Sequence, residues 1–246
     1  MLKVLNSLSY FESRLKVNLE NLKQIKSILN FSKLLGINNV ILEPIREVKK
    51  INPKIKSEIQ DMTSLNVYYR HCLQINSLNQ FKKKIRNYSN SRDIVSIETN
   101  NQGIQLQAVK DSRVDVISYS NLKLLKSLSK GVLSLASQNS TFIEITLDMI
   151  FNKNRSIQSK TFRKLYNSIN LVMNSNSCLI LSGNFSDLYD FRNPRVLISI
   201  CNTLFDIPIP KAKKYFDDNP RLLIKSVSDR NNNHIYEKGV KLINGD

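Results

Sequence analysis

Short apolar runs alternate with longer amphipathic segments along almost the whole chain. The runs at 40–42, 93–98, 114–118, 142–147 and 178–181 are rich in Val, Ile and Leu, which is typical of buried strands. Between them lie segments in which apolar residues recur at helical spacing. Because strands that alternate with helices usually pair in parallel, this pattern predicts an α/β fold with a parallel sheet.

The organisation of the chain favours one domain. About seven strand–helix units follow one another through the 246 residues, with no linker, repeat or low-complexity break between them. A chain of about 250 residues with this pattern suits a closed barrel better than an open sheet. We therefore predict a single TIM-barrel-like (β/α) barrel domain over residues 1–246. Its least regular part is the start, where residues 2–5 are a candidate first strand.

Several of the expected helices carry clusters of cations. The longest helix, at 155–174, has a basic start formed by Lys160, Arg163 and Lys164. A helix at 121–129 places Lys123, Lys126 and Lys130 on one face. A helix at 78–85 ends in Lys82, Lys83 and Lys84 and is followed by Arg86. Cations stabilise a helix C-terminus locally, and we give this explanation of the last cluster the same weight as RNA contact.

The segment 178–195 is the best candidate for a binding site from its local chemistry. It begins as a strand and breaks at a turn of small residues, 182–184, before a helix that is expected to begin near Pro194. A helix N-terminus beside arginines is suited to binding an anion. An ordinary strand–helix loop with two solvated arginines explains the same pattern. The residues concerned are Ser182, Gly183, Arg192 and Arg195.

The charge of the chain narrows the class of partner. The chain has 37 Lys and Arg but only 20 Asp and Glu, which gives a net charge of +17. Such an excess favours a polyanionic partner, with nucleic acid ahead of an anionic membrane surface. Part of the excess has a second explanation, because an AT-rich genome enriches any protein in Lys, Asn and Ile.

Residues that usually carry catalysis are scarce. The six glycines form no GxGxxG or phosphate-binding loop, and His71 and His234 lack the paired spacing of a histidine-based metal site. We interpret His71 as a packed strand residue. Cys72, Cys178 and Cys201 are far apart and odd in number, so we expect small buried side chains in a reducing cytosol rather than disulfides. A basic, histidine-poor barrel is more typical of a binding protein than of a self-sufficient enzyme.

No segment suggests a membrane partner. Residues 1–3 lead into a polar mixture rather than the apolar core of a signal peptide. The longest uncharged run, 165–186, has 22 residues, but ten of them are Asn or Ser, so it is too polar to span a bilayer. We therefore expect a cytoplasmic protein.

The order of motifs in the second half resembles a known family. FIEITL at 142–147 is followed by a basic helix at 155–173, CLILSGN at 178–184, LYDFRNPRVLISIC at 188–201 and NPRLLI at 219–224. This series is similar to protein component 3 of ribonuclease P, the archaeal counterpart of the thirty-kilodalton eukaryotic subunit. The resemblance covers roughly residues 20–243 and is best from 112 to 224. Residues 1–17 lack a clear match to the Asp-bearing strand with which the family opens.

The resemblance implies a TIM-barrel-like fold akin to the polymerase and histidinol phosphatase barrels, but without their metal site. It implies a subunit of an endoribonuclease in which a catalytic RNA, with Mg²⁺ held by that RNA, hydrolyses the bond between the 5′ leader and precursor tRNA. The implied partners are ribonuclease P RNA, a second small protein subunit and further protein subunits, with precursor tRNA reached indirectly. The chain itself would bind no cofactor, supply no catalytic residue and be inactive alone.

Within such a complex, the residues of the basic helix start and of the 182–195 segment become candidate contacts to RNA phosphates or to a partner protein. They are Lys160, Arg163, Lys164, Ser182, Gly183, Arg192 and Arg195. For Arg192, a buried salt bridge to Asp187 or Asp190 is a structural alternative. A stand-alone barrel phosphohydrolase acting on a small phosphorylated substrate is the alternative function. It would have Glu144, which we expect to point into the barrel or lie at the strand's end, and the turn at Ser182 and Gly183 at its mouth. It needs a metal or base that the sequence does not reveal.

Overall fold

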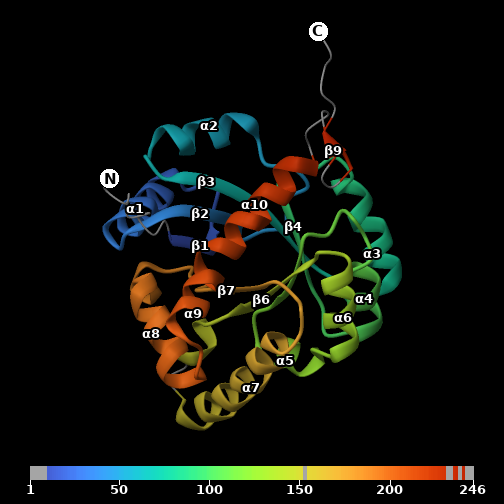
Figure 1. Cartoon of the computed structure of the whole chain (residues 1–246). Coiled ribbons are helices and arrows are strands. Elements are labelled where there is room, and N and C mark those ends of the chain that lie inside the picture. Colours follow the sequence, from blue (N-terminus) through green and yellow to red (C-terminus); the bar gives the residue numbers. More distant parts are fainter. Residues whose placement is uncertain (1–9, 152–153, 231–234, 238–239, 242–246) are drawn as a thin grey trace, which may run out of the picture.

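Seven parallel strands form one sheet in which each strand pairs with the next along the chain, in the order β1 to β7. The computed structural model describes residues 10–151, 154–230, 235–237 and 240–241, the last two segments by their backbone alone. The sheet curls into a barrel with helices around it (Figure 1), which confirms the predicted TIM-barrel-like fold. The strands are β1 (Tyr10–Val17), β2 (Ile37–Pro44), β3 (Asn66–Gln74), β4 (Ile94–Glu98), β5 (Val116–Tyr119), β6 (Phe142–Thr146) and β7 (Leu179–Ser182).

Helices connect the strands and cover the outside of the barrel. They are α1 (Leu22–Leu34), α2 (Pro53–Asp61), α3 (Leu78–Ile85), α4 (Gln102–Ala108), α5 (Leu122–Ser127), α6 (Lys130–Gln138), α7 (Arg155–Met173), α8 (Pro194–Phe205), α9 (Ile209–Phe216) and α10 (Asp218–Arg230), with short 3-10 turns η1 (Arg86–Tyr88), η2 (Asp148–Phe151) and η3 (Leu188–Asp190). From α1 to α8, each helix follows an Asn or Ser whose side chain accepts a hydrogen bond from a backbone N–H of the first turn. Such caps set the helix starts locally. A short antiparallel pair, β8 (Ile235–Glu237) and β9 (Val240–Lys241), follows α10.

The expectation of one helix at 121–129 is wrong. Leu128 has an extended backbone, and the Ser129 hydroxyl accepts a hydrogen bond from the backbone N–H of Val132 at 3.4 Å, so a new helix begins there. Lys130 therefore belongs to α6 and does not extend a helix face with the lysines of α5. The candidate strand at 2–5 lies outside the described residues, and the first strand of the sheet is β1.

The cysteines are all free, as expected, but they are not all buried. Cys201 is buried within α8, and Cys72 on β3 is partly exposed. Cys178, which directly precedes β7, is exposed. The prediction of a buried side chain is therefore wrong for Cys178.

An apolar layer fills the barrel at its N-terminal end. Inward side chains of five strands pack there against one face of α10, which lies across this end of the barrel in Figure 1. Burial of these apolar side chains stabilises the contact between the helix and the barrel. The C-terminal end of α10 is held by Arg230, whose Nη1 donates to Asp115 at 2.8 Å. The layer consists of Ile41, Ile94, Val116, Phe142 and Ile180 from the strands, and Leu223 and Val227 from α10.

The barrel closes along a narrow seam between β1 and the residues that follow β7. The Lys16 N–H donates to the Phe185 carbonyl at 3.0 Å, and Leu15 pairs with Phe185 in an isolated bridge. A side chain completes the seam, since the Gly183 N–H donates to Glu12 Oε1 at 2.9 Å. Glycine is required at position 183 because a Cβ there would overlap the buried ring of Phe185.

Gly183→Ala is expected to lower the free energy of unfolding by about 1–3 kcal/mol, because Phe185 must leave its packed position. Gly131→Ala is the matched control. A Cβ on Gly131, in the first turn of α6, meets nothing closer than Leu106 at 3.9 Å, so stability should stay unchanged or rise by up to about 1 kcal/mol. Urea unfolding followed by circular dichroism measures both variants. Equal effects would contradict close packing at the seam.

Candidate functional site

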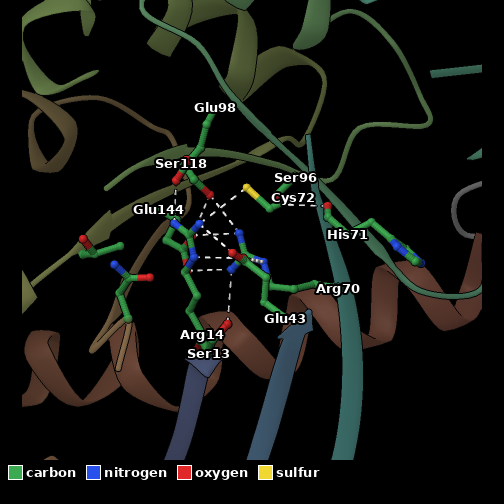
Figure 2. Close-up of polar contacts among 12 residues, drawn as sticks. Ser13, Arg14, Glu43, Arg70, His71, Cys72, Ser96, Glu98, Ser118 and Glu144 are labelled. Carbon is green, nitrogen blue, oxygen red and sulfur yellow. Dashed lines mark hydrogen bonds and ion pairs between the residues drawn. The ribbon is translucent and has the colours of Figure 1, made fainter. Parts of the chain in front are cut away.

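Two arginine side chains occupy the middle of the barrel, above the apolar layer. Arg14 on β1 donates through Nε and Nη2 to Glu43 on β2, both at 2.9 Å, and through Nη1 to Glu98 on β4 at 2.7 Å. Arg70 on β3 donates to both carboxylate oxygens of Glu144 on β6, at 2.8 and 2.9 Å, and its Nε lies 3.2 Å from Glu43. All five side chains are buried, and Figure 2 shows them converging from different strands. We refer to these five residues as the arginine–glutamate network.

Glu144 is held in its ionised form. Burial opposes its ionisation, but Arg70 and Arg14 outweigh burial, and hydrogen bonds from Arg70 and Ser118 act in the same direction. Together they lower the pKa of Glu144 to about 2. The Ser118 hydroxyl donates to Glu144 Oε2 at 2.6 Å. Both carboxylate oxygens are thus engaged, and a carboxylate with so low a pKa is a poor proton acceptor at neutral pH.

Glu12 lies beside the network and is held by backbone amides. Its Oε1 accepts hydrogen bonds from the N–H of Gly183 at 2.9 Å and from the N–H of Arg14 at 3.1 Å. Burial raises the pKa of Glu12 to about 8, although these two N–H donors lower it in part. Glu12 therefore carries a proton at neutral pH, and the seam is closed by a neutral carboxyl group.

The network fills the region of the barrel in which enzymes of this fold usually place their reacting groups. Among residues 10–151 and 154–230, no group of three or more His, Cys, Asp or Glu is arranged to hold a metal ion. His71 is buried, its ring centre lies 5.0 Å from that of Tyr88, and its Nε2 lies 3.2 Å from Asp93. The interpretation of His71 as a packed strand residue is confirmed. The geometry of the interior is that of a structural ion-pair cluster.

The structure separates the predicted contact residues into an exposed and a buried group. The exposed residues are Lys160 and Arg163 on α7 and Arg195 at the start of α8, with Lys164 half-buried. Ser182 and Gly183 are buried at the seam, where they shape the end of β7. The role of all these residues in binding RNA or a partner protein stays a prediction.

Arg192 is held by contacts other than the salt bridge considered from the sequence. Its Nη1 donates to the backbone carbonyls of Tyr189 and Phe191, both at 2.8 Å. Its guanidinium group lies 4.9 Å from the centre of the Phe151 ring, a distance suited to a cation–π contact. Neither Asp187 nor Asp190 takes part in these contacts. The Arg192 side chain is therefore held in place without a salt bridge to either aspartate that would neutralise its charge.

The 3-10 turn η2 links the two predicted basic groups. Gln158 of α7 donates from Nε2 to the Ile150 carbonyl at 2.7 Å, next to the Phe151 ring beneath Arg192. The basic start of α7 and the arginine-bearing loop before α8 therefore approach the same turn. Both follow strand ends, on the side of the barrel where loops of this fold carry function.

Sequence reasoning identified only one member of the arginine–glutamate network. Glu144 points into the barrel, as expected from its apolar neighbours. Arg14 and Arg70 were not recognised. Arg14 shares β1 with Glu12 and Lys16, so the sequence gives no clear signal there, whereas Arg70 lies in β3 among Val, Tyr, Cys and Leu. An arginine inside a strand of that kind is a signal for a paired interior cation, because arginine is almost never fully buried without a partner.

The fold and its interior define a class of protein, a parallel (β/α) barrel whose centre is closed by ion pairs. The model of the family described as RNase P subunit p30 matches residues 10–232. The chain therefore belongs to the RNase P subunit p30 family. The match begins at β1, so it includes the first strand of the barrel, which the sequence alone left without a counterpart.

Two curated relatives resemble part of the chain. Ribonuclease P protein component 3 of Methanocaldococcus jannaschii is 26% identical over 149 residues, which cover 60% of this chain and 64% of the relative. A protein of the same name from Methanococcus maripaludis is 23% identical over 129 residues, 52% of this chain and 56% of the relative. The chain thus matches less than two thirds of the length of each of these relatives.

Solved structures share the fold over nearly the full chain. A chain in the cryo-EM structure of an archaeal ribonuclease P with mature tRNA superposes with a TM-score of 0.75 at 20% identity, covering 95% of this chain and 99% of that chain. A putative 2-pyrone-4,6-dicarboxylic acid hydrolase from Pseudomonas putida reaches a TM-score of 0.55 at 9% identity, covering 89% and 98%. None of the helices in the described part of the chain is long and apolar enough to cross a membrane.

Replacing Glu12 or Glu144 with glutamine should change the free energy of unfolding, and the two changes should depend on pH in opposite directions. In the folded protein Glu12 keeps its proton up to about pH 8, whereas in the unfolded chain it releases the proton near its ordinary pKa of 4.5. Between these two values a rising pH therefore lowers the free energy of unfolding. Glu12→Gln removes this titration. The variant should therefore gain stability relative to the parent as pH rises from 5 to 8, by on the order of 1 kcal/mol per unit.

Glu144→Gln is the matched substitution on the other side of the interior. It leaves Arg70 without its carboxylate and should cost about 3–5 kcal/mol at neutral pH. Because the pKa of Glu144 is lowered from 4.5 to about 2, the loss in free energy of unfolding relative to the parent should become smaller as pH falls through this range. Urea unfolding from pH 3 to pH 8.5 measures both variants. Parallel, pH-independent losses in the two would contradict the assigned protonation states.

Proposed function

We propose that the chain is an RNA-binding protein subunit of ribonuclease P. The observation that carries the proposal is the family match over residues 10–232. The fold supports it, since it corresponds over almost its full length to one chain of an archaeal ribonuclease P bound to mature tRNA. In this function the chain supports the catalytic RNA in removing the 5′ leader from precursor tRNA, and it contributes to an endoribonuclease without being active alone.

The proposed partners follow from the charge and the family. They are ribonuclease P RNA, a second small protein subunit and further protein subunits, and precursor tRNA is reached indirectly. A net charge of +17 supports neutralisation of RNA phosphates as the contribution of this chain. We infer that the chain holds no cofactor, that the Mg²⁺ of the reaction is bound by the RNA, and that the complex works in the cytoplasm.

The interior of the barrel argues against a stand-alone phosphohydrolase. That function would need Glu144 as a base or ligand at the mouth of the barrel. Both oxygens of Glu144 instead accept hydrogen bonds from Arg70, and Ser118 donates to one of them. The likeness to barrel hydrolases at about one tenth sequence identity is a likeness of fold alone.

Reconstituted cleavage of precursor tRNA tests the proposal. The catalytic RNA is assayed at low Mg²⁺ with its other protein subunits, with and without this chain. Addition of the chain should raise the cleavage rate, because neutralised phosphates lower the need of the RNA for divalent cations. The same rate with and without the chain would refute the subunit role.

Arg192→Ala tests the predicted phosphate contact. If Arg192 neutralises one phosphate, the plot of log affinity for ribonuclease P RNA against log salt becomes shallower by about 1 unit. Lys225→Ala is the control, because it removes one exposed charge from α10 at the opposite end of the barrel. Filter binding at several salt concentrations gives both slopes. An unchanged slope for Arg192→Ala would exclude the contact.

A further inference from the structure

A polar pocket opens at the C-terminal mouth of the barrel, between the ends of β1, β2 and β3. Its volume is about 270 Å³. Its floor is the buried Arg14–Glu43 pair of the arginine–glutamate network. The predicted contact residues on α7 and α8 take no part in it, so it is a separate feature of the molecule. The walls include Lys16, Glu47, Cys72 and Gln74.

The chemistry of the pocket suits a neutral group with both donors and acceptors. Arg14 and Glu43 already satisfy each other, so the floor offers no unbalanced charge. The Gln74 amide and the Lys16 ammonium have no hydrogen-bond partner within the described chain, and both line the wall. A glutamine amide donates and accepts at once, which matches the edge of an unpaired nucleobase.

Two basic segments border the pocket and form what we call its basic rim: the first contributes Ile45 and Glu47 to the wall, and the second contacts Glu47 through Lys84. The segments 45–54 and 78–86 carry eight Lys and Arg against one acidic residue, Glu47. Lys84 pairs with Glu47 at 2.5 Å and joins the two segments, and the hydroxyl of Tyr88, just after the second segment, donates to the Val48 carbonyl at 3.1 Å. The remaining cations of the rim project into solvent, where they can contact phosphates. The exposed ones are Arg46, Lys49, Lys50, Lys54, Lys82, Lys83 and Arg86.

We infer that the mouth pocket receives one unpaired nucleotide of a single-stranded RNA segment, whose neighbouring phosphates lie along the basic rim. The inference rests on the proposed function, because it requires that the chain binds RNA. It adds the place of binding, which is the mouth pocket, and the form of the RNA, which is single-stranded. A base fits the donor and acceptor groups of Gln74 and Lys16, and the rim neutralises the backbone on either side. An acidic peptide would bring a carboxylate against Glu43 and Glu47, so the pocket disfavours it.

The test uses the full-length chain and a short single-stranded RNA that carries one 4-thiouridine. Photocrosslinks mapped by mass spectrometry should fall on the pocket wall, at Lys16, Cys72 or Gln74. Gln74→Ala should weaken binding of this RNA about 5- to 10-fold without changing its salt dependence, because no charge is lost. The Gln74 side chain is exposed and makes no hydrogen bond in the described chain, so the variant keeps the fold.

The basic rim is tested separately. Lys49→Ala combined with Lys50→Ala should make the log–log salt plot shallower by about 1.4 units, or about 0.7 per phosphate on a single strand. Lys123→Ala combined with Lys126→Ala removes the same charge from the exposed face of α5 and should leave the slope unchanged.

The outcomes separate the inference from the function on which it rests. Crosslinks outside the pocket, with Gln74→Ala binding like the parent, would overturn the inference while leaving RNA binding intact. Rim variants that keep their RNA affinity but no longer associate with a second protein subunit would make the rim a protein-docking surface and would also overturn it. Failure of the parent chain to bind single-stranded RNA or ribonuclease P RNA would remove both the inference and the proposed function.

Discussion

The arginine–glutamate network is the constraint on which the rest of the structure depends. Removing a guanidinium group from water costs several kcal/mol unless carboxylates replace its hydration, so Arg14 and Arg70 specify which residues face them. Glu43, Glu98 and Glu144 come from three other strands and meet this requirement together. The strands must therefore close into a barrel of one register, because any slip would leave a buried charge without a partner.

The network also bears on where the proposed partners would bind. The N-terminal end of the barrel is closed by α10 over an apolar layer, and the centre is filled by ion pairs. Neither region offers a reactive group to a substrate. Most of the remaining Lys and Arg are exposed on the outer surface, on helices and on loops at strand ends, where the proposed partners would bind. A binding subunit of a ribonucleoprotein fits this division between a closed interior and a basic exterior.

The small-residue turn after β7 has its partner within the chain. Small residues let a backbone approach another group closely, and the Gly183 N–H donates to a carboxyl oxygen. That carboxyl belongs to Glu12 of the same chain. The turn therefore closes the barrel, and its glycine is needed because Phe185 occupies the space of a side chain. The neutral form of Glu12 suits this position, since a charged carboxylate would face Glu144 across the interior.

The sequence by itself determined the alternation of strands and helices, the barrel class, the cation clusters and the inward direction of Glu144, because each depends on residues close together along the chain. It did not reveal β1, since Glu12 and Arg14 interrupt the apolar pattern by which a strand is recognised. Nor did it reveal the break between α5 and α6, where the Ser129 cap outweighs a continuous helical spacing. Only the tertiary structure decided the ion pairs and the mouth pocket, because Arg14 and Glu98 are 84 residues apart and meet only when the barrel closes.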